Sequence, residues 1–210
     1  MALGTNNTNA PKGLTLVDSM VGGKPRINMY FVPSTDGTAI FIGDPVTLGG
    51  TAGAAGTVVN GIDVEGMPTV KQNTTVSTPV GVAVAFLPKQ SDLSVKHREA
   101  STARIVLVSD DPEAIYEIQE DSLVSVLAAA DIGEGVDIII GTGSATTGLS
   151  QAMIDSSSHA TTGKTLRILR LAPRVDNTMG DGTVTGATAT LYAKWLVTFA
   201  EHQYKSADGL

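Results

Sequence analysis

Apolar and polar residues alternate most regularly near the end of the chain, in the segment ATLYAKWLVTFAEHQY from residue 189 to 204. In an extended conformation, one side of this segment carries Leu191, Ala193, Trp195, Val197 and Phe199. The other side is largely polar, with Leu196 as the exception. A period of two is typical of a strand with one face on a core. We therefore predict a strand with Trp195 in the core and Lys194 facing outward or toward a neighbouring subunit; the alternative is that Trp195 lies at a contact between subunits.

Short apolar runs bounded by Gly, Pro, Asn and Asp recur along the rest of the chain. They are INMYFVP from residue 27, MPTVKQ from 67, VGVAVAFLP from 80, ARIVLVS from 103, AIYEIQ from 114, VDIII from 136 and TLRILRL from 165. A short helical turn is expected within LVSVLAAAD (123–131), and a long polar connection over 142–164. About ten short strands with no long amphipathic helix predict an all-β fold, an antiparallel β-sandwich or barrel of jelly-roll-like form.

The chain divides into three parts by composition. Residues 1–26 are polar and rich in Gly and Asn, and we expect them to form an extended arm outside the core, with a disordered terminus as the alternative. Residues 27–204 form the β-rich domain, with two small β subdomains divided near residues 100–122 as an alternative, and residues 205–210 form a tail. The arm supplies the candidate residues for contact with a capsid or another subunit: Leu14, Leu16, Val17, Met20, Val21, Lys24 and Arg26.

Charge and composition remove several classes of function. The formal net charge is −7 and the basic residues are scattered, which argues against nucleic-acid binding. The chain has no cysteine, which excludes disulfides and thiolate metal sites. No apolar run approaches the roughly 20 residues of a membrane helix, and the first residues lack the pattern of a signal peptide. We expect no membrane partner and synthesis in the cytoplasm.

The sequence contains only incomplete matches to motifs for phosphate or metal binding. Gly163, Lys164 and Thr165 end like a phosphate loop, but Ser158 stands where a glycine is required and a strand follows. The three histidines, His97, His159 and His202, are widely separated and form no ligand pair of the usual spacing.

The densest acidic cluster lacks the spacing of a calcium loop and is expected to be a solvated turn and strand face. It comprises Asp110, Asp111, Glu113, Glu117, Glu120 and Asp121. We therefore expect no catalytic residues, no metal and no cofactor, and predict that the protein is not an enzyme.

Several sequence segments, taken in their order along the chain, resemble those of a known protein family. They are YFVPSTDGTAIFIGDPVTLGG, GVAVAFLP, REASTARIVLVSDDPEAIYEIQEDS, TGLSQAMIDSSS, LRILRLAPRVDN and AKWLVTFAEHQY. Together they resemble the cement or decoration proteins of tailed-bacteriophage virions, over about residues 22–204. The resemblance implies a β-rich fold on the outer capsid surface of the virion, bound to the major capsid protein and to itself, often as a homotrimer. It implies no catalytic residues.

Other virion roles stay open at this stage. A head fibre, neck or tail component would share the β-rich composition. A carbohydrate-binding or hydrolytic virion module would need aromatic platforms, and aromatic residues make up only 4% of the chain. A major capsid protein would need a long spine helix, and no segment predicts one.

Overall fold

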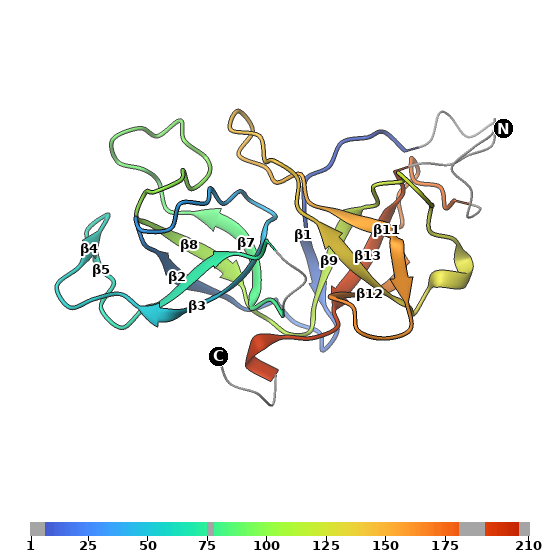
Figure 1. Cartoon of the computed structure of the whole chain (residues 1–210), viewed down its shortest axis with the longest axis horizontal. Helices are drawn as coiled ribbons and strands as arrows, with labels where there is room; N and C mark the ends of the chain where they lie inside the picture. The colour runs from blue at the N-terminus through green and yellow to red at the C-terminus, as the bar shows by residue number, and fades with distance from the viewer. Residues whose placement is uncertain (1–6, 75–77, 181–191, 206–210) are drawn as a thin grey trace.

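The computed structural model describes residues 7–74, 78–180 and 192–205 and consists of two β-bodies side by side (Figure 1). One is a closed barrel and the other a six-stranded sheet. The prediction of an all-β, largely antiparallel fold is confirmed. Within the described residues, no helix has the length and apolar character to cross a bilayer.

The barrel closes through five strands in the order β2-β6-β3-β7-β8. Their bounds are β2 Ile27–Val32, β3 Pro45–Ala52, β6 Pro68–Gln72, β7 Gly81–Phe86 and β8 Arg104–Ser109. Neighbouring strands are antiparallel except β2 and β6, which run parallel and meet at Phe31 and Thr69. A small hairpin of β4 (Val58–Val59) and β5 (Ile62–Asp63) extends from it. Alternate valines fill the barrel because alternate side chains of each strand point inward.

The second body is a sheet with the order β1-β9-β13-β12-β10-β11. Its strands are β1 Thr15–Ser19, β9 Ala114–Gln119, β10 Gly135–Ile139, β11 Met153–Ala160, β12 Leu166–Leu171 and β13 Lys194–Phe199. A bridge from Ile154 to Glu120 brings β11 back beside the end of β9, so the sheet curls around its own core. Two 3₁₀ turns, Ala129–Asp131 (η1) and Gln203–Lys205 (η2), are the described helical elements.

The core of the second body confirms the interpretation of the C-terminal segment. Trp195 is fully buried, and Val197 and Phe199 lie in the same apolar cluster. Lys194 begins β13 and is only partly buried. Leu191 lies outside the described residues. Trp195 is therefore a packing residue.

Two expectations from the sequence need correction. Residues 15–19 are not part of a free arm, because β1 pairs with β9 and the neighbouring Leu14 lies in the core. The supposed polar connection over 142–164 contains the eight-residue strand β11. Its sequence, MIDSSSHA, is polar because much of the strand is not packed on the core.

In sequence, the barrel strands lie between β1 and β9. The chain returns to the second body between Ser109 and Ala114. Arg26, just before the barrel, donates from Nε to the carboxylate of Asp110, just after it, at 2.9 Å. A second link joins the Leu14 amide to the Gly43 carbonyl at 2.9 Å. Gly43 has φ of +95°, and a Cβ there would lie 2.4 Å from the Lys12 carbonyl oxygen, so glycine is required at this crossing.

Candidate contact surface and polar sites

The structure separates the seven candidate contact residues into an internal group and an external group. Leu14 is buried, and Leu16 is partly buried against the core of the second body. Val17, Met20, Val21, Lys24 and Arg26 face solvent. The first two are therefore structural residues, and only the other five are available to a partner.

The exposed apolar residues concentrate in one stretch of chain. Of the twelve large apolar side chains that are exposed among the described residues, five fall within residues 17–29, so this stretch is the strongest candidate for a contact surface. We call this set the β1–β2 surface; its members are Val17, Met20, Val21, Ile27 and Met29. They are between 44% and 75% exposed. The sequence did not single out Ile27 and Met29, because they lie in a run assigned to the β-rich domain and not to the arm.

The geometry of two strands explains why these side chains point outward. The pairing of β1 with β9 shifts between Leu16 and Asp18, which leaves Val17 in a bulge away from the core. In β2, Ile27 and Met29 alternate with Asn28 and Tyr30. The side chain of Tyr30 is buried in the barrel core, so the apolar pair lies on the opposite face.

A buried carboxylate holds the base of this surface. Asp110 accepts hydrogen bonds from the side chains of Arg26, Asn28 and Tyr30, at 2.7–3.1 Å. Burial opposes its ionisation, but these donors outweigh burial and hold the pKa of Asp110 below its usual range. Tyr30 also meets Tyr204 from the C-terminal segment, at 2.9 Å between hydroxyl oxygens.

The acidic cluster is thus not a uniformly solvated face, and that expectation is wrong for three of its members. Asp110, Glu120 and Asp121 are each at most 5% exposed. Asp121 accepts hydrogen bonds from the backbone amide and the hydroxyl of Ser156, which fixes β11 beside the end of β9. These carboxylates organise the fold and do not form an open site.

Glu120 is the most unusual of them, because it is fully buried. Its carboxylate accepts hydrogen bonds from the amides of Leu127 and Ala193 and from Nε1 of Trp195, at 2.9–3.3 Å. Burial nevertheless dominates and raises the pKa of Glu120 to about 7. No cation pairs with it in the described part of the chain. It is enclosed by packing, which leaves no room for a substrate.

The turn that resembles a phosphate loop has a structural role. Lys164 forms an ion pair with Asp137 at 2.7 Å between Nζ and Oδ2. Gly163 takes a φ of +71° between β11 and β12. A lysine already neutralised by a carboxylate is a poor ligand for phosphate, and no helix follows it to present backbone amides.

The histidines differ in their surroundings. His202 is buried near the C-terminal end of the described chain, and burial lowers its pKa. His97 is buried and stacks on Phe41 at 4.6 Å between ring centroids. His159 is exposed, and it is the one that meets other ligand-type side chains.

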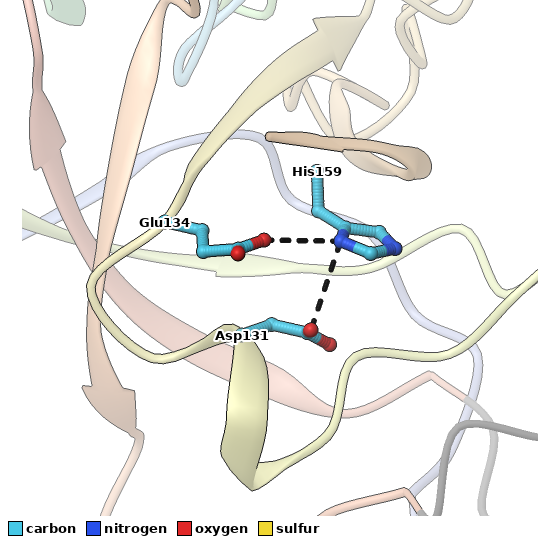
Figure 2. Close-up of side chains that lie close together, drawn as sticks. All are labelled: Asp131, Glu134 and His159. Atoms are coloured by element: carbon cyan, nitrogen blue, oxygen red, sulfur yellow. Dashed lines mark hydrogen bonds and ion pairs between the residues drawn. The ribbon is translucent and has the colours of Figure 1, made fainter. Parts of the chain in front are cut away.

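Figure 2 shows a cluster that the sequence spacing does not reveal. Nδ1 of His159 lies 3.1 Å from Oε2 of Glu134 and 3.6 Å from Oδ1 of Asp131. The three residues come from β11, from the turn before β10 and from η1, respectively. Asp131 and His159 are separated by 27 intervening residues, so a search for the short ligand spacings typical of metal-binding motifs cannot find them.

Comparisons with family models, with curated proteins and with solved structures find no match to this chain.

Proposed function

We propose that this chain is a structural protein of a tailed-bacteriophage virion, which binds the outer surface of the major capsid protein shell as a homotrimer and stabilises it. Its localisation is then the virion exterior, after synthesis in the host cytoplasm. The proposal draws on the ordered phrases that resemble cement proteins. It also draws on the all-β fold and on the position of the exposed apolar residues.

The observation that carries the proposal is the β1–β2 surface. Five large apolar side chains in thirteen consecutive residues face solvent on a chain that is otherwise acidic and turn-rich. Exposed apolar groups mark protein contact sites where they gather into one patch, and this stretch has the highest concentration of them among the described residues. Lys24 lies between them and adds positive charge to a chain of net charge −7, which would favour an acidic patch on the partner, whereas Arg26 is already paired with Asp110.

The base of this surface is rigid, which suits a role in binding. Because Asp110 fixes Arg26, Asn28 and Tyr30, the strand that presents Ile27 and Met29 loses little freedom on docking. Many copies on one shell would then multiply modest contacts. Stability outside a cell would come from the two buried cores and from oligomerisation, since disulfides are absent.

The test is cosedimentation of the purified full chain with shells of the same phage that lack it. We compare the wild type with the double variant Val17→Asp/Val21→Asp. Burying a valine fully contributes about 1.5–3 kcal/mol. If docking buries each of these two valines in part, their replacement by aspartate is expected to weaken binding at least tenfold. The control is Val175→Asp, since Val175 is 95% exposed and lies outside the β1–β2 surface.

Unchanged binding of the double variant would refute the role of this surface. Failure of the wild type to bind any shell would refute the cement function itself. A few copies per virion by densitometry, in place of hundreds, would instead favour a head fibre, neck or tail component. Specific signals on a glycan array would favour the carbohydrate-binding alternative. Sedimentation equilibrium tests the homotrimer.

A further inference from the structure

We propose that Asp131, Glu134 and His159 form a binding site for a divalent transition-metal ion, of the size and chemistry of Zn²⁺. This inference does not depend on the proposed role in a virion. It rests on the positions of three ligand atoms and on the charges around them (Figure 2).

The spacing of the ligand atoms fits a metal ion. One ligand atom from each of Asp131, Glu134 and His159 lies within 4.8 Å of the other two, and Nδ1 of His159 is 3.1 Å from Oε2 of Glu134 and 3.6 Å from Oδ1 of Asp131. Metal–ligand bonds of about 2.1 Å place neighbouring ligands about 3.4 Å apart in a tetrahedron and about 3.0 Å apart in an octahedron. A small cation therefore fits among these atoms with little movement.

The hydrogen-bonding capacity of the imidazole points to the same occupant. Nδ1 can carry only one proton, yet it faces two carboxylates. A single N–H can point well toward only one of these carboxylates. The second carboxylate then lies close to the first without a donor from the imidazole. A divalent ion at the centre satisfies both carboxylates and the nitrogen lone pair together.

The charged residues around the site leave the negative charge of the two carboxylates, Asp131 and Glu134, largely uncompensated. Neither Asp131 nor Glu134 pairs with a lysine or arginine among the residues that the structure describes. Arg167, on the adjacent strand β12, directs Nη1 to the carbonyl oxygen of Gly133 at 3.4 Å. Lys164 is paired with Asp137.

The local backbone holds two of the ligands in place. The second oxygen of Asp131, Oδ2, accepts a hydrogen bond from the Ala128 amide at 2.8 Å, which turns Oδ1 toward the imidazole. The amide of Glu134 donates to the Asp131 carbonyl at 3.0 Å, and the amide of Gly133 donates to Ile168. The turn between η1 and β10 is thus tied to itself and to β12.

The donor set selects the metal. Two carboxylate oxygens and one imidazole nitrogen suit Zn²⁺, Mn²⁺, Co²⁺ or Ni²⁺, whereas Ca²⁺ and Mg²⁺ prefer oxygen ligands alone. The side chain of His159 is 40% exposed, so water can occupy the remaining coordination positions. A bound ion would link the turn before β10 to the end of β11 and stabilise the second body.

The test uses the full chain after removal of metals with a chelator. Calorimetric titration with ZnCl₂ is expected to show one ion per chain, with at least tenfold weaker binding of MgCl₂ and CaCl₂. Co²⁺ is expected to give d–d absorption bands that Zn²⁺ abolishes. At a Zn²⁺ concentration of one hundred times Kd, the midpoint of thermal unfolding is expected to rise by about 5–10 °C.

Three variants assign the ligands: His159→Ala, Glu134→Gln and Asp131→Asn. Each is expected to weaken Zn²⁺ binding at least tenfold while circular dichroism shows the same strand content as the wild type. Asp92→Asn is the control, because Asp92 is an exposed acidic residue outside the cluster and its substitution is expected to leave binding unchanged. Absence of saturable Zn²⁺ binding to the wild type overturns the proposal, and so does wild-type affinity in His159→Ala.

Discussion

Burial of Glu120 predicts that the protein loses stability as pH rises through neutrality. Folding raises the pKa of this carboxyl from 4.5 to about 7, so the folded chain holds more protons than the unfolded chain between these values. Stability falls with pH wherever the folded state binds more protons. A pKa difference of one between the folded and unfolded chain corresponds to about 1.4 kcal/mol. Relative to its protonated form, ionised Glu120 therefore lowers the free energy of unfolding by about 3 kcal/mol above pH 7.

The measurement compares wild type and Glu120→Gln by urea unfolding at several pH values from 5.5 to 8.5, above the sequence pI of 4.8. Glutamine keeps the size of the side chain but cannot ionise, and its amide group will leave one neighbouring donor without an acceptor. That loss is constant with pH, whereas the contribution of Glu120 is not. We expect the variant to gain about 2 kcal/mol relative to the wild type over this range.

Glu65→Gln is the matched control for the substitution itself, since Glu65 is exposed. A difference between Glu120→Gln and the wild type that stays constant within about 0.5 kcal/mol from pH 5.5 to 8.5 would refute the argument, because an effect of ionisation must change over this range.

Three further substitutions test the packing and the crossing between the two bodies. Trp195→Ala is expected to lower the free energy of unfolding by about 3–5 kcal/mol, measured by urea titration, because Trp195 is fully buried. Asp110→Asn is expected to reduce it by about 1–3 kcal/mol at pH 7; because the pKa of Asp110 is lowered, the difference should shrink in unfolding measurements below about pH 4. Gly43→Ala is expected to lower the thermal midpoint more than Gly56→Ala, because both have positive φ but only at Gly43 would a Cβ meet backbone, at Lys12.

The strands were predictable from sequence where one face packs on a core. The segment around Trp195 and the short apolar runs correspond to β13, β2, β6, β7, β8, β9, β10 and β12. β11 was missed because Ser156, Ser157 and Ser158 give it no apolar period. Its strand conformation depends on ladder hydrogen bonds to β10 and on the contact of Ser156 with Asp121, which are long-range features.

The candidate sites were less accessible from sequence, because burial decides what a charged residue does. Asp110 and Glu120 look alike as members of one acidic run, yet folding lowers the pKa of the first and raises that of the second. The difference lies in Arg26 and Asn28, which reach Asp110 from more than 80 positions earlier in the chain. His159 likewise meets Glu134 only because β10 and β11 are neighbours.

The ion pair between Arg26 and Asp110 joins the two points where the barrel connects to the remainder of the chain. Residues 27–109 are consequently an insertion whose ends are adjacent, and β1 and β9 on either side of it are already paired as neighbours. Closely spaced ends are what the exchange of one domain for another requires, and a replacement must also cover the core of the second body where Val82 of the barrel packs against it. The protein thus offers a defined graft point for displaying foreign sequences.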